Sequence, residues 1–218
     1  AEVEDAAAAL DHTAARRLLH GHWQPLRLHE VAALMDSGAV VVDACRHRLR
    51  AAALTLDLAR RPILFTLLRA LAEAWPGDAE RDVLIARAFR IRDVDETHRA
   101  RLRVEIGRLR ALVKPVGGIE ATTRGFALRA PEVAVLAPPM EGEASELLAL
   151  LADGAAWSTS ALALALGESQ RNVQRELAAL EAAGRVRAVG QTRSRRWLAP
   201  PLTGFTTILL LPAALPLG

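Results

Sequence analysis

The 218-residue sequence has very few cysteines, lysines and long apolar runs, and each shortage excludes certain structural features or classes of protein. Cys45 is the only cysteine, so no disulfide within the chain is expected and a reducing cytoplasm is the predicted compartment. No apolar run reaches the roughly 18–20 residues of a transmembrane helix, and the acidic start does not resemble a signal peptide. Hydrophobic residues nevertheless make up 51% of the chain, which predicts a folded core.

The basic residues are almost all arginines. Lys114 is the only lysine among 28 basic residues, so the formal net charge of +3 and the pI of about 10.2 depend on arginine. Arginine stays charged and forms paired hydrogen bonds to phosphates and to guanine edges, which suits nucleic acid. A GC-rich genome would also raise the arginine content, so the argument depends on where the arginines lie.

Motifs for catalysis and metal binding are missing. The sequence contains no G-x-S-x-G, no Walker-type phosphate loop and no G-x-G-x-x-G. His20, His22 and His29 match no strong metal-ligand spacing, and carboxylate pairs such as Asp93 and Asp95 are explained by helix capping. We therefore expect no enzyme activity, no cofactor and no bound metal.

The first part of the chain is predicted to be helical and then β-like. Residues 1–37 contain an alanine-rich stretch at 6–19 and a shorter apolar stretch at 28–35, both with helical spacing. Runs typical of strands at 40–42 and 54–58 then flank an arginine-rich segment. The sequence therefore predicts a helical N-terminal extension followed by a small antiparallel sheet.

The same order of elements, three helices and then a hairpin, is predicted twice. The first copy occupies residues 38–131 and the second occupies residues 143–200. Between them, residues 132–142 contain a Pro-Pro pair and few helix signals, which predicts a linker. Residues 201–218 form an uncharged apolar tail, which we expect to pack on its own domain or on a second subunit. Packing on a second subunit, which would make a homodimer, is slightly favoured over packing on its own domain.

Helix ends are predicted from capping residues. Asp78, Asp95, Ser158 and Ser169 each precede a stretch of helical spacing, and Gly184 follows one. Short polar side chains cap the first amides of a helix, and glycine commonly follows its last turn. The second and third helices of both units are therefore predicted to begin or end at these residues.

Three helices followed by a two-stranded hairpin, with a basic third helix, resemble a winged helix-turn-helix. Residues 38–130 in particular resemble the DNA-binding domain of OmpR/PhoB-type regulators. In that family a strand leads into the first helix, as Leu56-Asp57-Leu58 does here, and residues 102–110 (L-R-V-E-I-G-R-L-R) lie in register with the family's third helix.

Two further segments extend the resemblance. The family's hairpin, called the wing, ends in G-x-G-Y, of which Gly125 and the aromatic Phe126 are present. Residues 143–199 resemble a MarR-like winged helix through the pattern S..NV.R.L..L...G.V. The resemblance implies a mainly α fold (α+β with small β-hairpins), built from tandem winged helix-turn-helix domains after a helical N-terminal extension. It also implies a bacterial-type transcriptional regulator that binds specific sequences of double-stranded DNA.

The third helix of the first unit has the layout of a DNA-reading helix. Leu102, Ile106 and Leu109 predict one buried stripe, and the opposite face carries small residues fringed by arginines. Such a helix fits the major groove, which is about 12 Å wide. The alternative is a helix between two protein layers whose arginines are only solvated. The predicted DNA contacts of this unit are Arg99, Arg101, Arg103, Val104 and Arg108, with Arg124 of the hairpin.

The third helix of the second unit has side chains suited to reading bases. Val173 and Leu177 are predicted to be buried, whereas arginine, asparagine and glutamine on the other side pair well with guanine or adenine. The following hairpin is basic and contains no acid, so it is expected to contact phosphates, or else to be a solvated loop. The predicted contacts are Arg171, Asn172, Gln174 and Arg175 on the helix, and Arg193, Arg195 and Arg196 on the hairpin.

A protein of another functional class would share these features. Tandem winged helices also act as protein–protein scaffolds in chromosome-organising and replication complexes, where the same surfaces bind protein. Double-stranded DNA is the expected partner of the regulator, with a homodimer, RNA polymerase or another protein as further candidates. Affinity for random DNA at low salt distinguishes the two functions.

Overall fold

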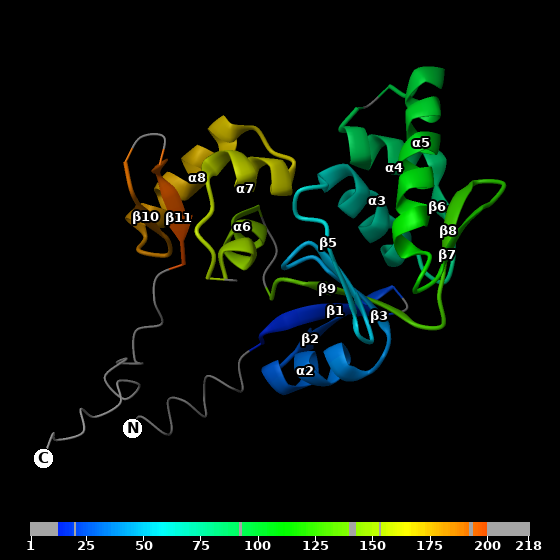
Figure 1. The fold of residues 1–218 in the computed structure, drawn as a ribbon, viewed down its shortest axis with the longest axis horizontal. Helices are drawn as coiled ribbons and strands as arrows, with labels where there is room; N and C mark the ends of the chain where they lie inside the picture. The colour runs from blue at the N-terminus through cyan, green and yellow to red at the C-terminus, as the bar shows by residue number, and fades with distance from the viewer. Residues whose placement is uncertain are drawn as a thin grey trace, which may run out of the picture.

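A six-stranded mixed sheet joins the N-terminal part of the chain to residues 133–137 (Figure 1). The computed structural model describes residues 13–19, 21–91, 93–139, 143–152, 154–191 and 194–199, which form seven helices and eleven strands. The order across the sheet is β2-β1-β9-β3-β4-β5, and only β3 and β9 are parallel neighbours. These strands are β1 (Ala15–Leu19), β2 (His22–Leu26), β3 (Val40–Asp43), β4 (Arg48–Ala51), β5 (Leu54–Asp57) and β9 (Val133–Ala137).

Strand β9 lies inside this sheet, where the sequence predicts a linker. It pairs with β1 on one side and with β3 on the other, and all five of its residues, V-A-V-L-A, are buried. A short continuous apolar run between Pro131 and Pro138 is typical of a strand that is buried on both faces. Residues 132–142 therefore contain the strand that ties the N-terminal hairpin to the rest of the sheet.

The N-terminal hairpin differs from the helix predicted at 6–19. The last residues of that stretch form β1, and the chain turns back into β2 at Gly21, which has a φ of +81°; residues 6–12 lie outside the described part of the chain. Pairing of β1 with the distant β9 overrides the local helical preference. Helix α2 (Leu28–Asp36) forms where residues 28–35 predict it and covers one face of the sheet.

Helix α3 (Pro62–Glu73) packs on the other face of the sheet and carries two helices on its opposite side. Leu67, Leu68 and Leu71 have no exposed area, and they join the sheet and both helices in one core. The two helices are α4 (Arg81–Phe89) and α5 (Glu96–Val113). A three-stranded sheet, ordered β6-β8-β7, completes this first unit: β6 (Ala79–Glu80), β7 (Gly118–Ala121) and β8 (Gly125–Arg129).

The last described part of the chain forms a second unit with a core of its own. Its Trp197 is 2% exposed, exchanges two backbone hydrogen bonds of 2.8 and 2.9 Å with Trp157, and donates its indole N–H to Thr159. These contacts fix the hairpin to the helices. The elements are α6 (Glu143–Leu151), α7 (Thr159–Leu166), α8 (Gln170–Ala182), β10 (Arg187–Val189) and β11 (Arg196–Leu198).

The prediction of a mainly α protein made of tandem winged helix-turn-helix domains with a helical extension is wrong. The chain has an α+β fold in which a six-stranded mixed sheet and two smaller sheets accompany the helices. The physical reason lies in α3, whose buried side chains extend well beyond one stripe. A helix that is apolar on more than one side needs a partner on each, and the large sheet provides the second.

Three of the predicted helix caps are confirmed. The side chains of Asp95, Ser158 and Ser169 each accept a hydrogen bond from the backbone amide three residues further on. The predicted cap at Asp78 is wrong, because α4 begins later in the chain. Asp78 instead accepts a hydrogen bond from the Thr122 hydroxyl at 2.7 Å, which ties it to the β7–β8 turn.

The turn between β3 and β4 buries a histidine against α3. The Asp43 carboxylate accepts the backbone N–H groups of Cys45 and Arg46 at 2.8 and 3.1 Å, which closes the turn. His47 follows with a φ of +50°, is 3% exposed and stacks on Phe65 with ring centroids 4.2 Å apart. Its Nδ1 has no hydrogen-bond partner within the described structure.

Lowering the pH is expected to destabilise the protein through His47. Burial lowers the pKa of this imidazole to about 4, against 6.5 for an unperturbed histidine. Between these values the unfolded chain binds a proton that the folded chain does not, so the free energy of unfolding decreases as the pH falls. The decrease reaches up to about 3 kcal/mol near the lower pKa, and urea unfolding at a series of pH values measures it.

The variant His47→Asn is the matched control for this effect. Asparagine tolerates a left-handed backbone better than most residues and does not titrate in this range. The variant should therefore lose much less stability than the wild type between neutral pH and the folded-state pKa. An identical pH dependence in the two proteins would contradict the role of His47.

Candidate nucleic-acid interface

Helix α5 presents the outer face that its sequence predicts. Leu102, Ile106 and Leu109 are at most 1% exposed, so the predicted buried stripe is confirmed. On the other side Val104 is 54% exposed, and the small residues beside it, among them Gly107, are exposed too. The outer face of this helix is therefore shallow and open to a partner.

Several of the predicted DNA-contacting arginines on α5 are paired with acids of the same helix. The guanidinium groups of Arg103 and Arg99 lie 2.7 and 3.6 Å from the carboxylate of Glu96. Arg108 lies 2.8 Å from Glu105, a carboxylate that is only 9% exposed. The side chains of all three arginines remain between 46% and 65% exposed. The two pairs with Glu96 are exposed on both sides and contribute about 0–1 kcal/mol, so an incoming phosphate could replace them at small cost. Separating Arg108 from Glu105 would instead leave a buried carboxylate without its partner, which is costly.

Arg101 has a different environment. Its guanidinium lies 4.4 Å from the ring centre of Phe89, at the end of α4. No acid of the described chain lies within ion-pair distance of it. Arg101 therefore keeps an uncompensated charge on the flank of α5 that faces α4.

A cleft of about 840 Å³ lies between α5, the start of α4 and the β7–β8 hairpin. Gly125 allows β6 to approach β8 closely, since a Cβ there would overlap the Ala79 carbonyl oxygen. The hairpin residue Arg124 pairs with Glu80 across the cleft. Among the described residues, five arginines and three acids line the cleft, so their summed charge is positive. The arginines are Arg81, Arg99, Arg103, Arg110 and Arg124.

Helix α8 exposes two arginines that no acid of the described chain pairs with. Arg171 and Arg175 lie one turn apart on the exposed face, with Gln174 beside them. The opposite face is held by Val173 and Leu177, which have no exposed area. Gly184, which was predicted to follow the last turn of this helix, has a left-handed backbone there, and this confirms the prediction. The exposed face of α8 therefore carries free guanidinium and amide groups on a fixed helix.

Asn172 does not belong to this exposed face. Its side chain is half-buried, and its amide N–H₂ donates to Glu168 at 3.3 Å. Its backbone N–H is already used by the Ser169 cap. Asn172 therefore stabilises the turn between α7 and α8.

The arginines of the β10–β11 hairpin have mixed environments. Arg195 pairs with Glu181 at 2.9 Å and lies over the ring of Trp197, 4.4 Å from its centre. Arg196 is half-buried and donates to the Arg195 carbonyl. Arg187, which was not among the predicted contacts, is exposed and has no acidic partner in the described chain. Arg193 lies outside the described residues.

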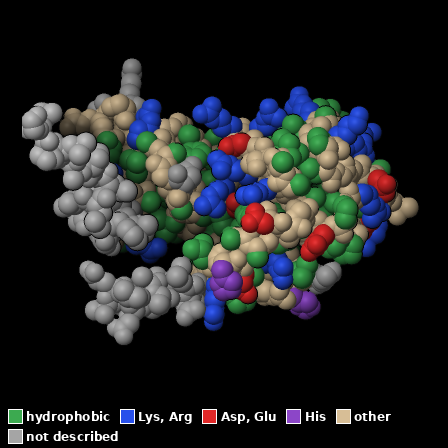
Figure 2. All heavy atoms as spheres, turned by 60° about the horizontal axis from the view of Figure 1, so that its bottom comes forward, with side chains coloured by type: hydrophobic (Ala, Val, Ile, Leu, Met, Phe, Trp, Pro, Cys, Tyr) green, Lys and Arg blue, Asp and Glu red, His purple; other side chains and the backbone are tan. Residues whose placement is uncertain are grey.

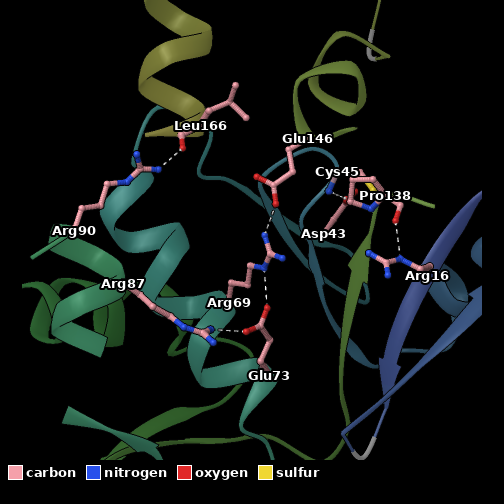
Figure 3. A network of polar contacts seen from close by, with 10 residues as sticks. All are labelled: Arg16, Asp43, Cys45, Arg69, Glu73, Arg87, Arg90, Pro138, Glu146 and Leu166. Atoms are coloured by element: carbon pink, nitrogen blue, oxygen red, sulfur yellow. Dashed lines mark hydrogen bonds and ion pairs between the residues drawn. The ribbon is translucent and has the colours of Figure 1, made fainter. Parts of the chain in front are cut away.

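Charged contacts connect the two units, as Figure 3 shows. Arg69 of α3 lies between Glu73 of its own helix and Glu146 of α6, at 2.8 Å from each carboxylate. Arg90, which follows α4 in the left-handed conformation, donates to Glu168 at 2.6 Å and to the Leu166 carbonyl at 3.0 Å. No sequence pattern predicts these pairs, because the partners lie 77 and 78 residues apart.

The predicted contacts are brought together in two separate groups. In Figure 1, α3 and α7 lie between α5 and α8, and α3 contacts α7 directly. In the first group Arg99, Arg103 and Arg124 line the cleft beside α5, whereas Arg101 and Arg108 line other hollows. In the second group Arg171, Gln174 and Arg175 lie on the exposed face of α8, and Arg195 and Arg196 lie on the following hairpin. Figure 2 shows Lys and Arg side chains along one edge and in the middle of the visible face, with acidic side chains among them.

Cys45, the potential metal ligands and the helices of the described chain are the other features that could indicate a function. Burial, and then the nearby Asp43 carboxylate, raises the pKa of the Cys45 thiol to about 12, so this thiol stays protonated at neutral pH. In the described ranges no three His, Cys, Asp or Glu side chains group as metal ligands, and His20 lies outside those ranges. None of the described helices has the length and apolar character needed to cross a membrane.

Comparisons with known proteins identify no family. No family model matches the sequence, and no curated protein matches it. Among solved structures, the DIP2311 protein of Corynebacterium diphtheriae is similar over 63% of this chain and 26% of its own, with 20% identity and a TM-score of 0.27. The match thus spans about a quarter of that protein's length, and similarity this low supports no statement about fold or function.

Replacing Arg90 with alanine is expected to loosen the second unit at the end of α7. The change removes the hydrogen bonds to Glu168 and to the Leu166 carbonyl, which satisfy groups at a helix terminus. Amide hydrogen exchange of residues 163–168 should become faster, while exchange in the core of the second unit stays unchanged. Mass spectrometry of peptides from the exchanged protein measures both regions.

Arg87→Ala is the matched control, because Arg87 lies on the same helix but pairs with Glu73 inside the first unit. This variant should leave exchange at residues 163–168 as it is in the wild type. If both variants changed exchange there equally, or neither did, Arg90 would not be the residue that holds the end of α7.

Proposed function

We propose that the protein is a cytoplasmic transcriptional regulator that binds specific sequences of double-stranded DNA. The observation that carries this proposal is the exposed face of α8, where Arg171 and Arg175 lie one turn apart without an acidic partner in the described chain. Two like charges held this close on a rigid helix repel each other unless a polyanion compensates them. A DNA duplex is a polyanion whose major groove admits a helix.

The side chains of this face suit base edges as well as phosphates. Arginine forms two hydrogen bonds with guanine, and glutamine forms two with adenine. Gln174 lies between the two arginines in sequence and is exposed. In this proposal Arg175 and Gln174 contact base edges, while Arg187 and Arg195 of the following hairpin contact the phosphate backbone.

Helix α5 provides a second contact in the same proposal. Its outer face is shallow around Val104, so it can approach the floor of a groove closely. Arg103 exchanges its exposed ion pair for a DNA phosphate or guanine edge, while Arg108 stays paired with the buried Glu105 and uses its other N–H groups. Arg124 contacts the backbone from the other side of the cleft. Binding to a sequence-specific site would then use both units of one chain.

Arg175→Ala is expected to weaken binding to a selected target duplex by about 1–3 kcal/mol and to relax preference at one base position. Arg195→Ala should instead weaken binding to target and random duplexes by similar factors, because a phosphate contact carries no sequence information. Selection of bound duplexes from a random pool supplies the target, and fluorescence anisotropy titration measures the affinities. Arg50→Ala, on the six-stranded sheet, is the control for loss of one positive charge.

Unchanged affinity in both Arg175→Ala and Arg195→Ala would remove the second unit from the interface. An equal loss in Arg50→Ala would show a general charge effect instead of contacts at particular residues. A preserved base preference in Arg175→Ala, with weaker overall binding, would assign Arg175 to the backbone.

Salt is expected to weaken binding steeply. Each phosphate that the protein neutralises adds about 0.9 to the slope of log affinity against log salt concentration. The variant Arg195→Ala should lower that slope by about one contact relative to the wild type. A titration series from low to physiological salt measures the slope, and an affinity that did not vary with salt would exclude a phosphate-based interface.

A protein–protein scaffold is the second candidate function, and one observation favours it. A groove of about 660 Å³ between α3, α5 and α7 is lined by apolar side chains, among them Ile63, Leu112 and Leu164, of which Leu164 is 49% exposed. Exposed apolar grooves are typical of surfaces that bind protein. Absence of affinity for random duplex at low salt would favour this function over DNA binding.

A further inference from the structure

A cavity of about 580 Å³ lies between the two units. Its described walls come from the β3–β4 turn, α3 and the end of α4 in the first unit and from α6 and the end of α7 in the second, with Arg101 of α5. Figure 3 shows Arg69, Arg87 and Arg90 around this region, below Glu146 and Leu166 of the second unit. Cavities of roughly 300–1,000 Å³ at the boundary between two units are the common location of small-molecule sites.

Among the residues that the structure describes, the charges around the cavity leave one cation, Arg101, uncompensated. Four arginines and two glutamates line it. Arg69 pairs with both glutamates, Arg87 pairs with one of them, and Arg90 pairs with an acid outside the lining. Arg101 pairs with no acid in the described chain. A ligand with one negative charge therefore matches the single positive charge of Arg101. A second negative charge on the ligand would have no described cation left to pair with.

The chemistry of Arg101 favours a planar anion. Its guanidinium carbon lies over the Phe89 ring, 4.4 Å from the ring centre, and no acid of the described chain pairs with its N–H groups. A carboxylate accepts two parallel hydrogen bonds from such groups, in the plane of the guanidinium. The covering ring also reduces the hydration that a bound anion must displace.

The rest of the wall is largely apolar. Ile63 and Phe65 of α3 and Leu166 of α7 contribute apolar surface, so the body of the ligand is apolar as well. His47, which is 3% exposed and stacks on Phe65, lies in the same wall and adds to its packed surface.

We propose that this cavity binds an amphipathic monocarboxylate with an aromatic or branched apolar body. Arg101 holds the carboxylate, and the apolar side chains of α3, α4 and α7 enclose the body. Because the walls belong to both units, the bound molecule contacts each of them at once. The site is separate from the exposed face of α8 that carries the proposed DNA contacts.

Calorimetric titration of the full chain, without DNA, tests this site. The probes are benzoate, naphthalene-2-carboxylate and 4-methylpentanoate, each compared with its neutral amide. At least one carboxylate should bind saturably, and its amide should bind about tenfold more weakly or worse, because the charge-assisted hydrogen bonds to Arg101 are lost. Arg101→Gln should weaken carboxylate binding by a similar factor.

Arg60→Gln is the matched control, since Arg60 is exposed and lies outside the cavity lining, and it should bind the carboxylate as the wild type does. Hydrogen exchange should slow at the end of α7 on addition of the carboxylate, which locates the site. Failure of all three carboxylates to bind at millimolar concentration overturns the proposal, as does equal binding of acid and amide. Equal binding by Arg101→Gln and wild type also overturns it, and none of these outcomes bears on DNA binding.

Discussion

Helix α3 has more apolar surface than one neighbour can cover, and this constraint shapes the first unit. Leu67, Leu68 and Leu71 have no exposed area, and the side chains of Leu64 and Phe65 extend the buried surface around the helix. Burying one large apolar side chain contributes about 1.5–3 kcal/mol to the stability of the folded state. Leaving one side of α3 exposed to water would therefore cost more free energy than many surface contacts contribute. The six-stranded sheet covers one side and α4 with α5 the other, so the position of α5 follows from the burial of α3.

The contact between the two units is of a different kind. Each unit has its own apolar core, and the contacts between them include the partly exposed ion pairs of Arg69 and Arg90 around a cavity. Such pairs contribute little free energy compared with a core. The faces of α5 and α8 are therefore rigid within their own units, whereas the angle between them depends on weak contacts.

Much of the local structure was predictable, and the longest-range pairings were not. Ser158 and Ser169 identified helix starts correctly, and the buried stripe of α5 followed from its spacing, because caps and helical periodicity depend on neighbours within one or two turns. The strand β1 was predicted as helix, since its pairing with β9 is invisible to local patterns. The apolar run that became β9 did carry a signal for a buried strand, between two prolines. For the candidate site, the exposure of Arg171 and Arg175 was predictable, but the hydrogen bond that Asn172 donates to Glu168 was not.

By itself, the sequence determined that the protein has two arginine-bearing helices with one buried and one exposed face, because amphipathic spacing within a helix is a local property. Only the tertiary structure decided which arginines keep an uncompensated charge. Arg103 pairs with an acid about two turns earlier on its own helix. Arg90 pairs with an acid of the other unit, and Arg101 lies against an aromatic ring beside a cavity. The free energy of a charge depends on every group that folding brings near it, and those groups come from distant parts of the chain.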